Sequence, residues 1–203
     1  MARESRSIVK LSRREGYALH PKAHKALVKR PTAPGQHGKA NVRKASQYAI
    51  QLREKQKVKR LYGLLERQFS KLMKEASKTS GQSGEQLLQY LEQRLDNVVY
   101  RSGFAMSRPA ARQLVSHGHF MLNGRRVDIP SIRLKPGDTV VIRQKSKSNQ
   151  YFVKIDETSP EPAKVDWLKV NRKKLEISVT GLPSRDDAEP DIKEQLIVEY
   201  YSR

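Results

Sequence analysis

The most regular hydrophobic pattern of the chain begins near residue 91. Apolar side chains recur there at intervals of three and four residues, which predicts one continuous helix with a single buried stripe. This stripe consists of Leu91, Leu95, Val98 and Val99. On that helix Arg94, Asn97 and Arg101 are expected on or near the opposite face, and Gly103 is expected to end it.

A second, shorter helix is predicted directly after the first. Ser107 can cap its start through the hydroxyl, Pro109 is tolerated in its first turn, and Gly118 supplies a left-handed residue at its end. Arg108 and Arg112 are four residues apart, so both are expected to project outward from one side. The two helices together predict a helix–turn–helix.

After Gly118 the apolar positions alternate with a period of two, as they do in strands. Asn123-Gly124 separates the alternating runs 120–122 and 125–129, which is a strong hairpin signal. Further strands are expected at 139–143, 151–155, 166–170 and 174–179, with a polar loop at 144–149 and an exposed connection at 158–163. The pattern predicts an α+β fold in which the helix–turn–helix packs on a small, mainly antiparallel sheet.

Helical spacing also marks both flanks of this module. Apolar positions between residues 48 and 72, interrupted at Gly63, predict two helices within 42–78. Residues 1–44 scatter basic side chains among proline, glycine and serine, which predicts a basic extension with little core of its own. At the other end Ile192, Leu196 and Tyr200 are spaced as on a helix that starts near Asp191.

The charge balance indicates a polyanionic partner. Of the 203 residues, 41 are lysine or arginine and 21 are acidic, which gives a net charge of +20, while 36% are hydrophobic. Nucleic acid is the expected partner, because no segment approaches the roughly 20 apolar residues that span a bilayer or resembles a signal peptide. Cysteine is absent, so neither disulfides nor thiolate metal sites are available, and we expect a cytoplasmic or organellar protein.

No group of side chains in the sequence suggests catalysis, a cofactor or a metal site. His117 and His119 are better explained by RNA contact or helix capping, and Asp96 and Asp128 by arginine pairing and turn chemistry. His20 and His24 lack further ligands for a metal, and residues 34–39 lack the spacing of a phosphate-binding Walker loop. We therefore expect a protein that is not an enzyme.

The run SRPAARQLVSHGHFMLNGRRVDIPS, followed by KPGD and VVIR, resembles the S4-type RNA-binding domain with its alpha-L motif. That domain also occurs in some pseudouridine synthases, bacterial tyrosyl-tRNA synthetases and a stress-response RNA-binding protein. The flanking runs RPTAPGQHGKA, LREKQKVKRLYGLLERQF and EQLIVEYYSR are similar, in this order, to the ribosomal S4 family of the small subunit. Nearly the whole chain shares the resemblance, in a cysteine-free form without the zinc knuckle of some members.

Three domains follow from this resemblance. They are a basic extension at 1–44, a helical domain at 45–90 that residues 180–203 complete, and an inserted S4-type RNA-binding domain at 91–179. The alternatives are a free RNA-binding protein and an RNA-modifying enzyme that carries the same domain. The chain leaves no room for a catalytic domain, and the basic extension and the C-terminal tail disfavour a free RNA-binding protein.

The resemblance and the basic surface together predict the RNA-binding residues. Within 42–78 we expect RNA contact, because two acids, Glu54 and Glu66, are too few to pair with the surrounding lysine and arginine side chains. The expected RNA-binding residues are Arg30, His37, Lys39, Arg53, Lys55, Lys57, Lys59, Arg60, Arg67, Arg94, Arg101, Arg108, Arg112, His117, His119, Asn123 and Arg125.

The acidic C-terminal segment is expected to contact protein, because phosphate repels carboxylates. The expected interface residues are Asp186, Asp187, Glu194, Tyr200 and Tyr201. By resemblance the chain is a structural constituent of the small ribosomal subunit and a primary binder of its rRNA. It would nucleate assembly at a 5′-domain helical junction and contribute to translational accuracy. Its implied partners are ribosomal proteins S5 and S3 and mRNA near the channel through which mRNA enters; autoregulation of its operon varies among members and stays open.

Overall fold

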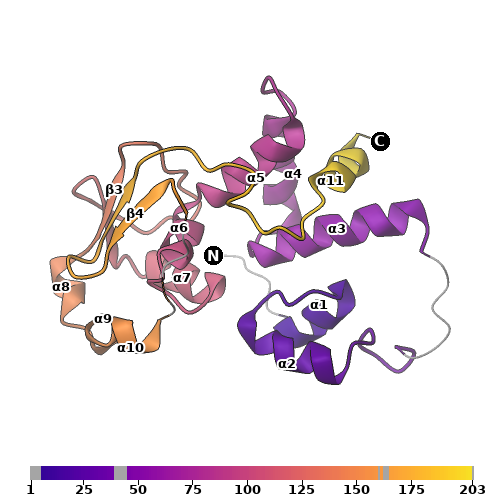
Figure 1. The fold of residues 1–203 in the computed structure, drawn as a ribbon, viewed down its shortest axis with the longest axis horizontal. Helices are drawn as coiled ribbons and strands as arrows, with labels where there is room; N and C mark the ends of the chain where they lie inside the picture. Colours follow the sequence, from indigo (N-terminus) through magenta and orange to yellow (C-terminus); the bar gives the residue numbers. More distant parts are fainter. Residues whose placement is uncertain (1–5, 39–44, 160, 162–164, 203) are drawn as a thin grey trace. The chain divides into compact units, whose positions relative to one another are not determined.

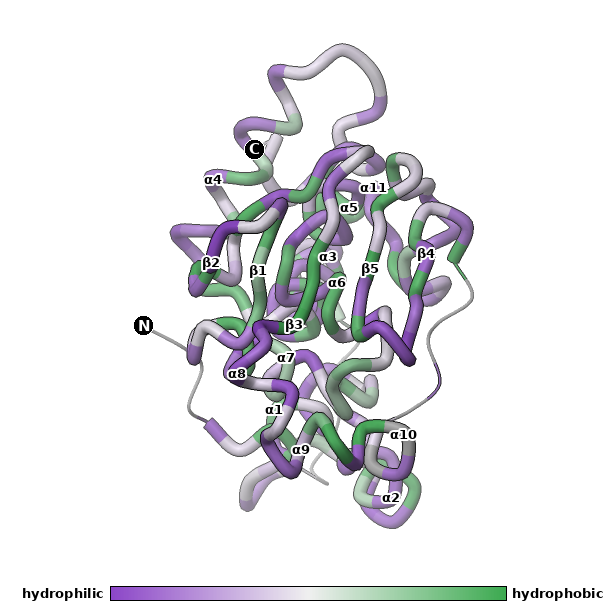
Figure 2. Tube along the Cα trace, turned by 90° about the vertical axis from the view of Figure 1, so that its left-hand side faces the viewer, coloured by the Kyte–Doolittle hydropathy of each residue, from purple (hydrophilic) through white to green (hydrophobic). Residues whose placement is uncertain are grey.

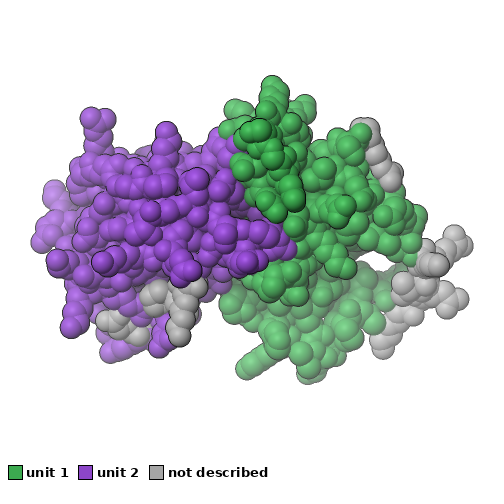
Figure 3. Space-filling view, turned by 45° about the horizontal axis from the view of Figure 1, so that its top comes forward, with its two compact units in different colours: residues 1–87, 189–203 green, residues 88–188 purple. Residues whose placement is uncertain are grey.

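The computed structural model describes residues 6–38, 45–159, 161 and 165–202, and the chain divides into two compact units. Unit 1 comprises residues 1–87 together with 189–203, and unit 2 comprises residues 88–188 (Figure 3). The C-terminal residues thus belong to the same unit as the N-terminal helices. Among the described residues, no helix is long and apolar enough to cross a membrane.

Unit 1 is helical (Figure 1). Its helices are α1 (Ile8–Glu15), α2 (Pro21–Lys29), α3 (Gln47–Leu61), α4 (Glu66–Ala76), the first part of α5 (Ser83–Glu92) and α11 (Glu194–Tyr201). The C-terminal α11 packs along α3 and buries Ile197 completely. Val58 of α3 and Phe69 of α4 are also fully buried, so these three helices share the core of the unit.

The sequence explains where the central helices of unit 1 start and end. The Ser46 hydroxyl accepts a hydrogen bond of 3.3 Å from the Ala49 amide and caps α3. Gly63, at φ +65°, follows the end of α3 and confirms the predicted break into two helices. The N-terminal segment has more structure than expected: α1 and α2 form there and bury Leu11, Leu19 and Ala23.

Unit 2 is an antiparallel sheet packed against two helices. The helices are α6 (Leu95–Arg101) and α7 (Arg108–Ser116), and three single-turn helices follow the third strand: α8 (Gln144–Lys147), α9 (Gln150–Val153) and α10 (Ile155–Thr158). The strands are β1 (Phe120–Leu122), β2 (Arg125–Val127), β3 (Thr139–Ile142), β4 (Leu168–Asn171) and β5 (Glu176–Val179). In Figure 2 the sheet faces the viewer and α6 lies behind it.

The sheet has the order β2-β1-β3-β5-β4, with every neighbouring pair antiparallel. Asn123 and Gly124 both have positive φ, +49° and +80°, as a two-residue hairpin between β1 and β2 requires. The core face of the sheet carries Phe120, Val140 and Ile177, which are completely buried. The α+β fold predicted from the alternation is therefore confirmed, as is the packing of Trp167 in the core of this unit.

The continuous helix predicted across residues 91–101 is wrong. The helix breaks at Gln93 and Arg94, where the backbone becomes extended and forms an isolated bridge to Arg133. The amide of Leu95 donates to the Ile132 carbonyl, and the amide of Leu134 donates to the Gln93 carbonyl. These long-range backbone bonds replace the helical ones, and they cannot be read from local periodicity.

The strand predicted at 151–155 and the loop at 144–149 are also wrong. Residues 144–147, 150–153 and 155–158 form the three single-turn helices α8, α9 and α10 instead. The Asn149 side chain accepts a hydrogen bond from the Tyr151 amide and caps α9, while Phe152 and Ile155 turn into the core three residues apart. Their spacing suits one helical face as well as an alternating strand, so the periodicity was ambiguous over so short a run.

Candidate RNA-binding surface

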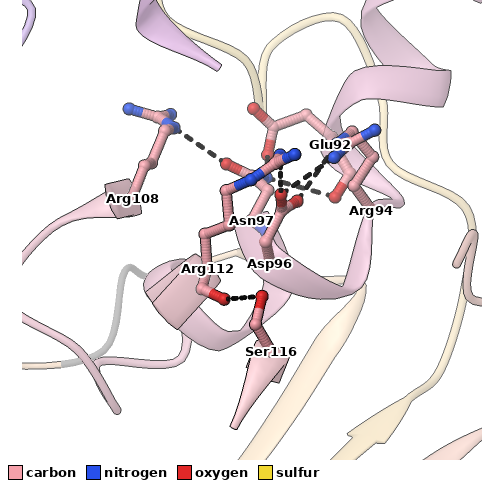
Figure 4. A network of polar contacts seen from close by, with 7 residues as sticks. All are labelled: Glu92, Arg94, Asp96, Asn97, Arg108, Arg112 and Ser116. Atoms are coloured by element: carbon pink, nitrogen blue, oxygen red, sulfur yellow. Dashed lines mark hydrogen bonds and ion pairs between the residues drawn. The ribbon is translucent and has the colours of Figure 1, made fainter. Parts of the chain in front are cut away.

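Four arginines gather around two buried carboxylates in the helix–turn–helix of unit 2. Figure 4 shows three of them, Arg94, Arg108 and Arg112, with Glu92, Asp96 and Asn97. Glu92 is completely buried, and Arg101 binds both of its oxygens, at 3.1 Å and 3.0 Å. Arg94 binds both oxygens of Asp96 at 3.0 Å and 2.8 Å. Bidentate pairs of this kind fix the plane of each guanidinium.

The arginines of α7 reach across to α6. Arg112 Nη1 lies 3.1 Å from Asp96 Oδ2, and Arg108 Nε donates to Asn97 Oδ1 at 2.9 Å. The Arg108 guanidinium also lies 4.6 Å from the centre of the Tyr100 ring, a cation–π distance. Asn97 is itself held by Glu92, whose Oε2 accepts from Nδ2 at 2.7 Å. We call Arg94, Arg101, Arg108 and Arg112 the α6–α7 arginine cluster.

Local chemistry at the start of α7 positions this cluster. The Ser107 hydroxyl accepts from the Ala110 amide at 3.4 Å, and Pro109 occupies the first turn, as predicted. The expectation that Arg94 and Asn97 face solvent is wrong, since their exposed fractions are 4% and 2%. Arg108 and Arg112 turn toward α6 rather than projecting outward in parallel, because Asn97 and Asp96 supply acceptors there. Pairing of Asp96 with arginine is confirmed.

The α6–α7 arginine cluster reaches the surface of unit 2. Arg94, Arg101 and Arg112 form ion pairs with Glu92 or Asp96, and Arg108 is held by Asn97. Arg101, Arg108 and Arg112 are only partly buried, so part of each of these side chains meets solvent. A surface of this kind suits phosphate groups.

Further predicted residues lie at the two ends of β1, with Asn123 and Arg125 at the hairpin and His117 and His119 before the strand. Arg125 is exposed, and Asn123 is exposed but anchored, since it donates to Asp138 at 2.8 Å and accepts from the Thr139 amide at 2.9 Å. His117 is exposed at the end of α7, whereas His119 Nδ1 lies 3.0 Å from the Ser146 hydroxyl. Burial, and then the neighbouring positive charges, lower the pKa of His119.

Sequence reasoning missed two arginines near these histidines. Arg126 of β2 lies with its guanidinium against Gly118, and Arg143, after β3, donates from Nη1 to the Gly118 carbonyl at 3.2 Å. The alternation along β2 offered a signal, because it places Arg125 and Arg126 on opposite faces of the sheet. Arg143 gave no local signal, since its approach to Gly118 depends on the pairing of β3 with β1.

The basic side chains of α3 are paired with carboxylates. Lys55 and Lys59 share Glu66, at 2.8 Å and 2.9 Å, and Lys57 lies 2.8 Å from Glu54. The inference that acids were too few to pair these bases is therefore wrong, because one carboxylate serves two lysines. A third acid contributes from α1: Glu15 binds Arg53 at 3.2 Å and Arg60 at shorter range.

The two shared carboxylates differ in their protonation chemistry. Burial alone would raise the pKa of Glu66, but hydrogen bonds from Lys55, Tyr201 and Lys59 bring it down to about 2. Burial raises the pKa of Glu15 despite the Coulombic pull of Arg53 and Arg60, because its side chain is fully excluded from solvent. The lysines and arginines of α3 therefore connect α3 to α1 through Glu15 and to α4 through Glu66.

The remaining predicted residues discussed here belong to unit 1. Arg30, His37 and Arg67 are exposed on unit 1, and Lys39 lies outside the described residues. In the C-terminal segment, the Tyr201 hydroxyl donates to Glu66 at 2.7 Å and Tyr200 packs on Tyr48, with ring centres 5.7 Å apart. Both tyrosines therefore serve the packing of α11 within unit 1.

The acidic residues of the C-terminal segment differ in exposure and in hydrogen bonding. Asp187 is used locally, since one of its oxygens accepts from the Ser184 amide at 2.7 Å and from the Ser184 hydroxyl at 2.9 Å. Asp186 is exposed, and Glu194, half-buried, begins α11. In the described part of the chain no three histidines or acids gather as a metal site would need. His20 instead caps α2, its Nδ1 accepting from the Lys22 amide at 3.0 Å.

Comparison with known proteins covers the whole chain. The ribosomal protein S4/S9 N-terminal domain matches residues 3–92, and the S4 domain matches residues 93–140. Proteins named small ribosomal subunit protein uS4 align over 100% of both chains; they include those of Chlorobium limicola (48% identical), Roseiflexus castenholzii (47%) and Chloroflexus aurantiacus (49%). That name is of a ribosomal protein and not of an enzyme. The resemblance seen in the sequence is confirmed, and the chain belongs to the uS4 family of small-subunit ribosomal proteins.

Proposed function

We propose that this chain is a structural constituent of the small ribosomal subunit that binds small-subunit rRNA directly. The main support for the proposal is the α6–α7 arginine cluster, three of whose arginines are held in place and only partly buried within the S4 domain. The net charge of +20 and the full-length similarity to uS4 proteins support it. No catalytic step is part of the proposed role.

The proposed mechanism is geometric and electrostatic. Double-helical RNA presents phosphates and 2′-hydroxyls rather than a readable major groove, so a protein recognises a folded junction by its shape. Guanidiniums that are already held in place by Glu92, Asp96 and Asn97 lose little freedom when they meet a phosphate. The cluster therefore favours one arrangement of phosphates over others.

The lysines and arginines of α3 are expected to act differently, because they are already paired with carboxylates. Lys55 is buried and paired with Glu66, so it would have to exchange a carboxylate for a phosphate to bind RNA. Arg67, Arg30 and His37 are exposed and remain proposed contacts of unit 1, together with Arg125, Asn123 and His117 of unit 2. We expect the contribution of α3 to come mainly through the field of its net positive charge.

We further infer the place of the chain in the subunit from its family. It would act as a primary binder that nucleates assembly at a helical junction of the 5′ domain. It would lie near the channel through which mRNA enters, beside ribosomal proteins S5 and S3, and contribute there to translational accuracy. The exposed carboxylate of Asp186 is a proposed contact for a basic protein neighbour.

Crosslinking in the native cell tests this function. The chain is crosslinked to total RNA, purified under denaturing conditions, and the adducted RNA is sequenced. We expect adducts concentrated in the 5′ domain of small-subunit rRNA, and the crosslinked peptides to include Arg108 or Arg112. Adducts spread over tRNA and mRNA, without enrichment in small-subunit rRNA, would contradict the proposal and favour a free RNA-binding protein.

A further inference from the structure

Two guanidiniums converge on Gly118, just past the end of α7. A Cβ added to Gly118 would lie 2.7 Å from Arg126 Nε and 2.8 Å from its Nη2, so the Arg126 guanidinium occupies the space beside the glycine. On the carbonyl side of the same residue, Arg143 Nη1 donates to the Gly118 oxygen at 3.2 Å. Gly118 has φ +70°, which favours glycine independently of this close approach.

Strand register places both arginines on the same face of the sheet. Arg126 pairs with Met121 across β1 and β2, and Met121 pairs with Val141 across β1 and β3. Arg143 follows Val141 by two residues, so it shares that face, and its amide donates to the His119 carbonyl to continue the ladder. Phe120 points to the opposite, buried face. In Figure 2 α6 lies behind the sheet, so the viewer looks at the face opposite the core.

Arg126 and Arg143 differ from Arg94, Arg101 and Arg112, which each form an ion pair with Glu92 or Asp96. The structure records no ion pair between Arg126 or Arg143 and any carboxylate of the described residues. The C-terminal end of α7 offers only a partial negative charge, equivalent to about half an elementary charge. The pKa of His119 is lowered, first by burial and then by His117 and Arg143, which agrees with a positive potential at this end of the sheet.

We propose that Arg126 and Arg143 form a second phosphate-binding site of unit 2, which takes a phosphodiester of RNA on the open face of the sheet beside Gly118. The inference rests on the proposed RNA-binding function and extends it to residues outside the α6–α7 arginine cluster. Two planar guanidiniums are well suited to phosphate oxygens, which they bind through paired N–H donors. Gly118 leaves room for the Arg126 fork that a larger residue would displace.

Binding of the intact protein to a small-subunit rRNA fragment tests the site. The Arg126→Gln, Arg143→Gln variant is compared with Lys135→Gln, Lys169→Gln, which removes the same charge from exposed positions of unit 2 toward the other end of the strands. We expect the arginine variant to bind about tenfold more weakly or worse, as loss of charge-assisted hydrogen bonds implies. Its log–log salt slope should also become shallower, by about 0.7 to 0.9 for each lost phosphate contact.

Two further measurements separate this site from general electrostatics. Arg126→Lys keeps the positive charge but loses the planar guanidinium. This variant should therefore keep the salt slope of the wild type and only part of its affinity. In a titration of the wild-type protein with hexauridylate, followed by nuclear magnetic resonance, the Gly118 amide and the Arg126 Nε–H should shift. In the arginine variant, which lacks the Arg126 Nε–H, the Gly118 amide should shift much less.

The outcomes distinguish the site from the wider function. If the arginine and lysine variants weaken binding equally and the Gly118 amide does not respond, the site is overturned while rRNA binding stands. If the wild-type protein shows no preference for small-subunit rRNA, the proposed function fails, and the response of Gly118 to hexauridylate still decides whether the site binds phosphate.

Discussion

Glu92 shows how a single acidic residue supports a basic surface. It is completely buried, binds Arg101 through both oxygens and orients Asn97, which in turn holds Arg108. A buried carboxylate is costly unless its hydrogen bonds are satisfied, and here two arginine bonds and an amide satisfy them. Glu92 is therefore a positioning residue for the α6–α7 arginine cluster.

The sign of the effect of Glu92→Gln on RNA binding tests this role. Simple Coulomb attraction predicts tighter binding, because a negative charge near phosphate is removed. Positioning predicts weaker binding, by about tenfold, because Arg101 loses its bidentate partner. The measurement is fluorescence anisotropy with an rRNA fragment, after circular dichroism has shown that the variant folds. Asp128→Asn, an exposed acid of the same unit, is the control and should bind as well as the wild type or better.

Glu66 should link the stability of unit 1 to acid pH. Its folded-state pKa of about 2 lies below its ordinary value of 4.5, so the native state favours the ionised carboxylate. The stability that it contributes is present above pH 4.5 and is lost as pH falls toward about 2. Urea midpoints of the wild type and of Glu66→Gln should therefore converge as pH drops through this window. A constant difference between the two would show that the carboxylate is not ionised preferentially in the native state.

At the scale of elements, the sequence predicted those that local chemistry defines. The hairpin at Asn123-Gly124, the break at Gly63 and the capped start of α7 at Ser107 all depend on residues within a few positions of one another. The break at Arg94 and the convergence of Arg126 and Arg143 on Gly118 depend on pairing between distant strands. Carboxylate pairing of the α3 bases was missed for the same reason, since Glu15 comes from a separate helix.

The cap of α7 should carry measurable stability. Ser107→Ala removes the acceptor for the Ala110 amide and should lower the free energy of unfolding by about 1 kcal/mol. Ser107→Asn, which supplies another capping oxygen, should recover most of that loss. Chemical denaturation followed by circular dichroism measures both changes. Equal losses for the two variants would mean that the hydroxyl acts through something other than capping.

At the scale of the whole molecule, the candidate RNA contacts and the candidate protein contact lie in different segments of the chain. The basic cluster lies in the S4 domain, whereas the exposed carboxylate of Asp186 follows the last strand of unit 2. Tyr200 and Tyr201, expected at a protein interface, are largely committed to packing α11 on α3 and α4. Asp186 is thus a better probe of partner contact than the tyrosines or Asp187.

Reversal of the Asp186 charge tests the division between RNA and protein contacts. Asp186→Lys should weaken capture of ribosomal protein S5 by the purified chain several-fold, because like charges across an interface repel. The same variant should bind isolated rRNA as tightly as the wild type or slightly more tightly. Loss of rRNA binding by a variant that still folds would show that the acidic segment takes part in RNA recognition.

If the α6–α7 arginine cluster holds rRNA phosphates, the affinity for rRNA must depend on salt through Arg108 and Arg112. Affinity for a small-subunit 5′-domain fragment is measured over a range of salt for the wild type, for Arg108→Ala, Arg112→Ala and for Lys173→Ala, Lys174→Ala as an exposed control. We expect weaker binding by the arginine variant and a log–log slope shallower by about 1.4 to 1.8, with the control nearly unchanged. Unchanged affinity and slope in the arginine variant would contradict phosphate binding by the cluster.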